Sequence, residues 1–180
     1  KMLVNVVATM AVCCALPRPE APAASNLWQY DRARQLDVNL RALTGRGVLA
    51  CPSPLTPQEA REVAESDKIV LVAHGNEEDP IFNYATRAAL KLWESDWDNF
   101  VRLPSRKSAE VQERSERQRL LDETRTKGYC DNYSGIRISS TGKRFRIKDV
   151  VVWNVHEEAD RSKPYVGQAA MFNMDDIEFL

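Results

Sequence analysis

The sequence is poor in the residues and motifs from which enzyme active sites are usually built. It contains only two histidines, His74 and His156, and it has no G-x-S-x-G, H-E-x-x-H or glycine-rich phosphate-binding motif. General acid–base catalysis requires a histidine or a carboxylate beside the reacting group, and nothing in the sequence marks such a position. We therefore expect a protein that is not an enzyme.

Cysteine is scarce as well. The four cysteines form no C-x-x-C pair and lie near neither histidine in the sequence, so zinc ligation is not expected. The acidic segment from Asn76 to Pro80 lacks the spaced ligands of a calcium-binding loop and is interpreted as a turn. The sequence thus predicts no metal site, and its idle thiols favour a reducing compartment.

A strong charge of either sign is also missing. The net charge is −1, and the 28% of residues that are charged are of mixed sign, so the chain has no field that would gather nucleic acid. Basic residues between Arg137 and Lys148 could meet phosphate, but Trp153 is predicted on the face of its strand opposite the basic residues there. No nucleic-acid partner is expected. A length of 180 residues predicts one domain with a substantial core.

One long apolar run is present, from Met2 to Leu16, and the proline-rich "PRPEAPAA" follows it. As a helix it would measure about 22 Å, which is short of the roughly 30 Å hydrocarbon layer of a membrane. We expect an organelle-imported protein that keeps a short apolar anchor. The alternative is an N-terminal helix packed on its own domain or on a partner. Residues 1–24 are accordingly interpreted as an apolar segment and linker.

Residues 25–66 are predicted to form a helical extension. Apolar residues recur at helical spacing between Asn26 and Leu43, and "TGRG" ends that pattern. Thr56 is the predicted N-cap of a second helix, with Pro57 at the first helical position and Glu59 completing a capping box.

From residue 67 onward the pattern changes to strands and helices in turn. The segment "KIVLVAHG", residues 68–75, is typical of a buried strand, and "PIFNYATRAALKLWE" is typical of a brief extended stretch followed by a helix with Ala85, Ala89, Leu92 and Trp93 on one side. Residues 108–127 form a charged, one-sided helix in this interpretation, and Gly128 ends it.

After Gly128 the hydrophobic period is two residues, which indicates half-buried strands. Two strands meet at a turn that contains Gly142, and residues 165–172 form a third. The apolar residues predicted to share the buried face of the second strand are Phe145, Ile147, Val151, Trp153 and Val155. These elements predict an α+β domain in which helices cover one face of an antiparallel sheet.

The strand before this turn is unusually polar. Asn132 and Ser134 have the same parity as Ile136 and Ile138, which predicts an amide and a hydroxyl on the buried face. Because buried polar groups need partners, they either form hydrogen bonds to the covering helices or line a small pocket.

The segments "VAHGNEEDPIFNYATRAALKLWE", "LPSRKSAE", "GYCDNYSGIRISSTGKRFRI", "VVWNV" and "GQAAMF" occur in this order. Together they resemble the MEKHLA domain, a PAS-like family of cyanobacterial and plastid proteins that is also found at the C-terminus of class III homeodomain-leucine zipper transcription factors of plants. The resemblance extends from about Trp28 to Phe172. It implies a PAS-like antiparallel sheet of about five strands with helices packed on one face, over residues 67–180, preceded by the N-terminal helical extension.

The resemblance also implies a non-catalytic sensor or protein-interaction module. The sequence lacks the "NCRFLQ" cysteine motif of photoactive relatives and carries no homeodomain or zipper, so the cofactor stays unknown and direct DNA binding is not implied. If a ligand pocket is present, the residues expected to line it are Asn83, Tyr84, Asn132, Tyr133, Trp153 and Gln168.

The resemblance further implies a chloroplast location, in the stroma or at the thylakoid membrane. A protein partner is expected, and the apolar start of the chain suggests a membrane complex contacted through residues 1–30. The alternative is an accessory structural subunit of a photosynthetic or other organelle membrane assembly, with no sensing role.

Overall fold

A computed structural model describes residues 18–110 and 114–180 of the chain. The apolar segment from Met2 to Leu16, expected to be an anchor, lies outside the described residues. Among the helices that are described, none combines the length and the apolar character needed to cross a membrane.

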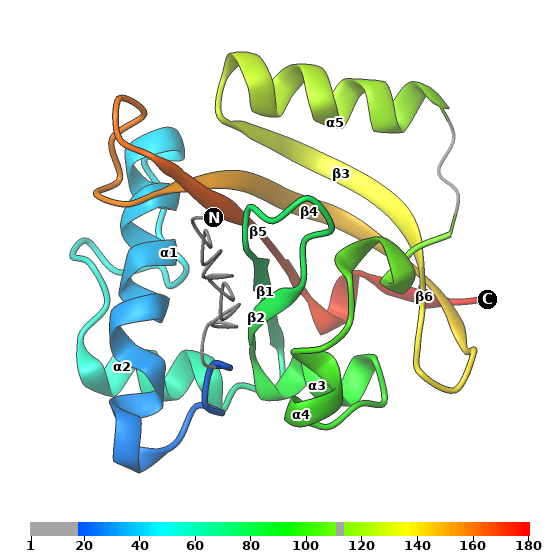
Figure 1. Ribbon diagram of the computed structural model, residues 1–180, viewed down its shortest axis with the longest axis horizontal. Coiled ribbons are helices and arrows are strands. Elements are labelled where there is room, and N and C mark those ends of the chain that lie inside the picture. The colour runs from blue at the N-terminus through cyan, green and yellow to red at the C-terminus, as the bar shows by residue number, and fades with distance from the viewer. Residues whose placement is uncertain (1–17, 111–113) are drawn as a thin grey trace, which may run out of the picture.

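In the described part of the chain, six strands form one antiparallel sheet (Figure 1). The strands lie in the order β2-β1-β5-β4-β3, and the short β6 pairs with the first part of β4. Their bounds are β1 Ile69–His74, β2 Phe82–Ala85, β3 Tyr129–Ile138, β4 Arg144–His156, β5 Tyr165–Asn173 and β6 Ile177–Phe179. The strand β6 lies in the C-terminal segment that was not predicted to be a strand.

Helices precede the sheet and are inserted between its strands. They are the 3-10 helices η1 Ala24–Gln29, η2 Ser105–Ser108 and η3 Met174–Asp176, and the α-helices α1 Tyr30–Thr44, α2 Pro57–Ala64, α3 Arg87–Leu92, α4 Trp97–Phe100 and α5 Arg114–Thr126. The capping box at Thr56 and Glu59 is confirmed. So is the end of the first helix, where Gly45 has a φ of 73° that costs glycine little.

The predicted helix over residues 108–127 begins later than expected. Ser108 belongs to η2, and Ala109 forms an antiparallel bridge with Arg137 on β3. The backbone at Ala109 and Glu110 therefore runs extended along β3, and α5 also lies beside β3 (Figure 1).

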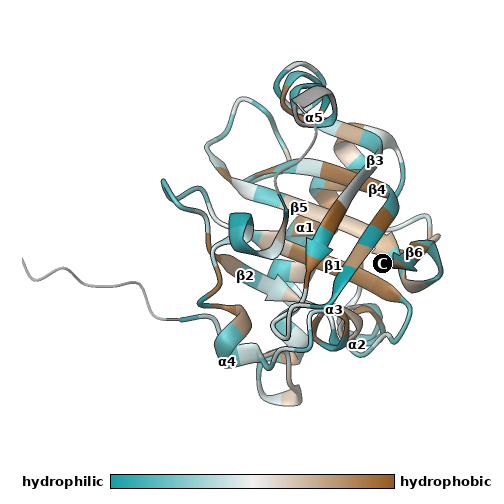
Figure 2. Cartoon of the chain, turned by 90° about the vertical axis from the view of Figure 1, so that its right-hand side faces the viewer, coloured by the Kyte–Doolittle hydropathy of each residue, from teal (hydrophilic) through white to brown (hydrophobic). Residues whose placement is uncertain are grey.

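Both faces of the sheet are covered, because side chains alternate along each strand. On β1, Val70 and Val72 belong to one core cluster with α3 and α4, whereas Leu71 and Ala73 belong to a second cluster with α1 and α2. We call these the first and the second face. Figure 2 shows the alternation as brown and teal residues along β3 and β4. The α+β class is confirmed, and the N-terminal extension covers the face that the other helices leave open.

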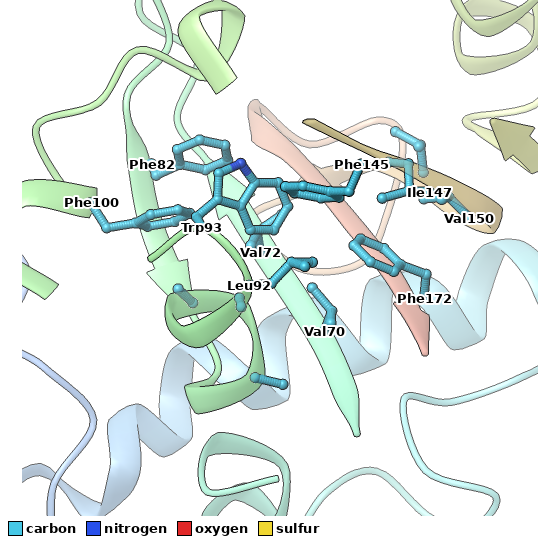
Figure 3. Packing of buried hydrophobic residues seen from close by; sticks show 14 of the residues in the cluster. Val70, Val72, Phe82, Leu92, Trp93, Phe100, Phe145, Ile147, Val150 and Phe172 are labelled. Carbon is cyan, nitrogen blue, oxygen red and sulfur yellow. The ribbon is translucent and has the colours of Figure 1, made fainter. Parts of the chain in front are cut away.

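The core of the first face is built around Trp93, directly after α3. Its ring centroid lies 5.9 Å from that of Phe100, 5.4 Å from that of Phe145 and 6.4 Å from that of Phe172, in edge-to-face arrangements. Figure 3 shows Trp93 between Phe82 and Phe100 on one side and Phe145 on the other. Each such aromatic pair adds about 0.5–1.5 kcal/mol beyond the burial of its surface, so this cluster fixes α3 and α4 on the sheet.

The prediction of one shared buried face for β4 is wrong. Phe145 and Ile147 belong to the core of the first face, but Trp153 and Val155 belong to the core of the second face, and Val151 packs against the latter. The cause is a β-bulge at Asp149, whose φ of 52° is left-handed. Because a bulge adds one residue to the strand, every side chain after it changes face.

Candidate ligand cavity

A cavity of about 590 Å³ lies over the first face of the sheet, bordered by η2 and α5. Its apolar wall comes from the sheet and from the segment after α3, and includes Val72, Phe82, Trp93, Ile147, Val150 and Phe172. Leu120 and Leu121 of α5 close another side. Natural ligand pockets have volumes of about 300–1,000 Å³, mostly apolar walls and a few directed polar groups, and this cavity has those properties.

One polar group in the wall has no partner. The side chain of Trp93 is only 2% exposed, and its indole N–H donates to no acceptor in the described structure. The indole nitrogen lies on the edge of the ring turned away from Leu92 and Val70 (Figure 3). A buried N–H without an acceptor costs about 1–3 kcal/mol, so an acceptor in the cavity would remove this cost.

The part of the wall formed by β3 carries Tyr133 and Arg137, which are both on the first face with Gly135 between them. The Nη2 atom of Arg137 donates to the hydroxyl of Tyr133 over 3.4 Å, and its Nη1 atom donates to the main-chain oxygen of Ile136 over 3.1 Å. A Cβ atom at residue 135 would lie 2.8 Å from that hydroxyl and 3.0 Å from Nη1 of Arg137. Gly135 therefore makes the space in which the two side chains meet.

The other charged residues of the wall are paired. Both carboxylate oxygens of Asp79 accept from Arg106 over 2.9 Å, and Oε2 of Glu110 accepts from Nη2 of Arg144 over 2.9 Å. These contacts lower the pKa of the Asp79 and Glu110 carboxyls. Among the described residues, no carboxylate lies within ion-pair distance of Arg137.

A row of polar side chains crosses the first face at one end of the cavity. His74, Gln168 and Asn154 are neighbours across β1, β5 and β4. The Nε2 atom of Gln168 donates to Oδ1 of Asn154 over 3.2 Å, and Nδ2 of Asn154 donates to the main-chain oxygen of Thr124 over 2.9 Å. Burial lowers the pKa of His74, whose Nδ1 lies 2.8 Å from the oxygen of Gly75. The row ties the end of α5 to the sheet.

The six residues expected to line a pocket are not brought together. Tyr133 and Gln168 line the cavity. Tyr84 and Trp153 are fully buried in the core of the second face, and the Trp153 indole donates to the oxygen of Leu36. Asn83 accepts a hydrogen bond of 2.9 Å from Nη2 of Arg32 on α1, and Asn132 is exposed.

Backbone irregularities explain this separation. Asn132 has a φ of 53°, and its bulge brings Cys130 and Tyr133 onto the same face while Asn132 points to solvent. A second bulge between β1 and β2 leaves Asn83 without a partner in the register. The strand parity used to place these residues is therefore interrupted at each of them.

Sequence reasoning did not single out Trp93 or Arg137 as cavity residues. Trp93 follows a helix whose apolar pattern predicts a core position, which is where it lies. Arg137 was counted with the basic residues of the hairpin, but Arg146 and Lys148 lie on the opposite face and pair with Glu178. Arg137 is distinguished in the sequence by its two-residue spacing from Gly135 and Tyr133, which places the three residues on the same face of the strand.

A partly buried cation lies on the second face. The guanidinium of Arg32 donates to Asn83 and to Gln35 over 2.9 and 2.7 Å, and burial lowers its pKa to about 10. Burial also raises the pKa of the nearby Tyr84 hydroxyl. The hydrogen bond between Arg32 and Asn83 joins α1 to β2, and none of these groups lines the cavity.

The curved antiparallel sheet with helices and a cavity over one face is the architecture of PAS-like domains. The structure is similar to the PAS domain of a protein from Colwellia psychrerythraea, with a TM-score of 0.50 and 10% identity over 65% of this chain and 94% of that one. It is also similar to the LOV protein of Rhodobacter sphaeroides, with a TM-score of 0.50 and 12% identity over 63% and 64% of the two chains. At such identities the likeness shows the fold alone.

The sequence itself identifies the family. The MEKHLA domain matches residues 30–175, which include α1, α2 and all of the strands except β6. The chain therefore belongs to the MEKHLA domain family. No curated protein matches it. A PAS-like MEKHLA domain supports a role as a sensor or interaction module.

Proposed function

We propose that this protein is a non-catalytic sensor module that binds a small molecule in the cavity and passes the change to a protein partner. The observation that carries the proposal is the cavity of about 590 Å³ with the unpartnered indole N–H of Trp93 in its wall. No described residue accepts from this donor, and a ligand with an acceptor atom would do so.

The position of α5 supports the second half of the proposal. Leu120 and Leu121 touch the cavity, and the side chain of Leu121 is also 53% exposed. A ligand that contacts both the sheet and α5 favours those positions of α5 in which the contacts form. A partner that binds α5 would then bind the ligand-bound and ligand-free protein with different affinities. The solvent-facing side of α5 is accordingly the proposed partner surface.

Filling the cavity tests the proposal. Ala170 lines the cavity from β5, and an Ala170→Leu substitution would occupy part of the space. We expect protein purified from its native source to release a small molecule on denaturation, detected by mass spectrometry, and the variant to release at least tenfold less. The control is Met171→Leu, which keeps the side-chain volume and packs against the second face of the same strand. Equal amounts from the variant and the wild type would contradict the proposal.

We also propose a chloroplast location, with the chain held at a thylakoid membrane complex through residues 1–30. The apolar run from Met2 to Leu16 and the resemblance to a family that includes plastid proteins support this proposal. The test is fractionation of plastids that contain either the whole chain or a chain truncated by residues 1–23. Loss of membrane association on truncation is expected, and retention would contradict the anchor.

An accessory structural subunit without sensing is the second candidate. It is favoured by the exposed Leu27, 53% accessible beside the half-buried Trp28, at the start of the described chain. Chemical cross-links from residues 18–30 to another subunit, together with no change of phenotype for Ala170→Leu, would favour this candidate over the sensor.

A further inference from the structure

We infer that the cavity accepts a small monocarboxylate with a flat apolar body. This inference rests on the proposed function and names the chemical class of the ligand. Three observations carry it: the apolar aromatic wall, a cation with no carboxylate partner among the described residues, and an N–H donor with no acceptor among them.

The wall determines the body of the ligand. Phe82, Trp93 and Tyr133 present ring surfaces, and Ile147, Val150 and Val152 present branched side chains. Apolar ligand surface that enters such a cavity gains about 25 cal/mol for each Å² removed from water, and flat rings stack against or meet the edges of aromatic side chains. A sugar or a small polyol would leave its hydroxyls without partners on this wall.

The charges determine the sign of the ligand. Arg106 is neutralised by Asp79, and Glu110 by Arg144, so neither adds a net charge to the cavity. Arg137 has only the main-chain oxygen of Ile136 and the hydroxyl of Tyr133 as acceptors among the described residues. Its remaining N–H groups form a planar fork that matches a carboxylate.

A single unpaired cation limits the charge of the ligand. The described wall contains no lysine and no second unpaired arginine, so a phosphate dianion would keep an uncompensated charge away from water, at high cost. One carboxylate matches the one guanidinium. The choice is therefore a monocarboxylate over a phosphate ester.

Two further donors complete the polar part of the site. The indole N–H of Trp93 has no acceptor in the part of the chain that the structure describes. The Tyr133 hydroxyl accepts the bond from Arg137, so its own hydrogen remains available to a ligand. Both are neutral donors, and they suit an oxygen acceptor without adding charge.

The experiment measures the dissociation constants of three probes for the full-length chain by saturation-transfer NMR titration. The probes are 3-phenylpropionate, its neutral amide 3-phenylpropanamide, and octanoate. We expect the amide to bind at least tenfold more weakly than the phenyl acid, since it lacks the charge that pairs with Arg137. We expect octanoate to bind at least threefold more weakly, because it lacks the ring.

Variants locate the binding. Arg137→Gln should weaken the binding of 3-phenylpropionate at least tenfold. The matched control Arg146→Gln, on the opposite face of the same hairpin, should change the dissociation constant less than twofold. Trp93→Phe should weaken binding about threefold by removing the N–H donor. If loss of the buried indole prevents folding, Arg137→Gln still tests the inference, because Arg137 is only partly buried and its replacement should leave the fold intact.

The outcomes separate this inference from the proposed function. Equal binding of the acid and the amide, or no effect of Arg137→Gln, would contradict the inference that the ligand is a carboxylate. Release of a native ligand that is reduced by Ala170→Leu would still support the proposed sensor function. Binding of octanoate as tight as that of 3-phenylpropionate would contradict the inference that the ligand has a flat ring. If no probe binds and the native protein releases no small molecule, both the inference and the proposed function are contradicted.

Discussion

The indole N–H of Trp153 on β4 donates a hydrogen bond of 3.2 Å to the main-chain oxygen of Leu36 on α1. Both side chains are fully buried in the core of the second face. The contact attaches the N-terminal extension to the side of the sheet opposite the cavity. The extension is thus part of the folded core, and the family match that begins at residue 30 includes it.

Trp153→Ala is expected to destabilise the protein by about 3–5 kcal/mol, because it leaves a large cavity between α1 and the sheet. Trp153→Phe should cost about 1–2 kcal/mol, mainly through the lost hydrogen bond. Urea unfolding measures both. The control is Trp28→Phe, since the half-buried Trp28 also donates through its indole, to Glu65 over 3.3 Å, and should cost less than about 1 kcal/mol. A similar loss at both tryptophans would contradict a special role for the α1 contact.

Asp37 organises the connection between α1 and α2. Its carboxylate is fully buried, accepts from the main-chain N–H groups of Val48 and Leu55 over 2.8 and 3.2 Å, and pairs with Nε of Arg41 over 2.7 Å. Asp37→Asn keeps the shape but removes the charge, and we expect a loss of about 3 kcal/mol in the free energy of unfolding. Asp31→Asn, exposed on the same helix, should cost at most about 1 kcal/mol. A loss at Asp37 as small as that at Asp31 would refute the role of the buried charge.

The features predicted correctly from the sequence are local ones. The capping box at Thr56, the left-handed Gly45 after α1 and the positive φ of Gly142 in the hairpin depend on residues adjacent in the chain. The antiparallel order of β3, β4 and β5 follows from short connections. Such features are specified by local propensities and turn chemistry.

What could not be predicted are the positions at which the strands bulge. Asn132 and Asp149 both take left-handed backbone angles, which asparagine and aspartate tolerate better than most residues, but nothing in their neighbourhood requires it. Each bulge moves the following side chains to the other face, so the expected site was divided between two cores. The cavity itself depends on contacts between distant segments, which no local pattern reports.

The bulge at Asp149 can be tested directly. A valine at a left-handed position costs about 1–2 kcal/mol, so Asp149→Val should lower the free energy of unfolding by that amount, whereas Asp149→Asn should change it by less than about 0.5 kcal/mol. Both variants are measured by urea unfolding. Lys148→Val, at the exposed neighbouring position without a positive φ, removes only the exposed ion pair with Glu178 and should cost less than about 1 kcal/mol. Equal effects at residues 148 and 149 would show that the backbone angle is not the cause.

Glu94 connects the end of α3 to the β3–β4 hairpin and gives the fold a pH dependence. Its carboxylate accepts from Ser139 over 2.7 Å, from Thr141, and from Nζ of Lys143 over 2.6 Å. The hydrogen bond from Lys143 is the largest cause that lowers the pKa of Glu94 from 4.5 to about 2, followed by those from Thr141 and Ser139.

Because the pKa is lower in the folded state, the carboxylate contributes stability that is fully present above about pH 4.5 and is lost as the pH falls toward 2. Glu94→Gln removes this contribution, so its melting temperature should be lower than that of the wild type at pH 7. The difference should shrink between pH 4.5 and 2 and vanish only below pH 2, where the wild-type carboxyl is protonated as well. Thermal melts followed by circular dichroism measure this, with the exposed Glu157→Gln as the control. A difference that stays constant from pH 7 to 2.5 would mean that the glutamine disturbs packing and that the charge of Glu94 does not hold the hairpin.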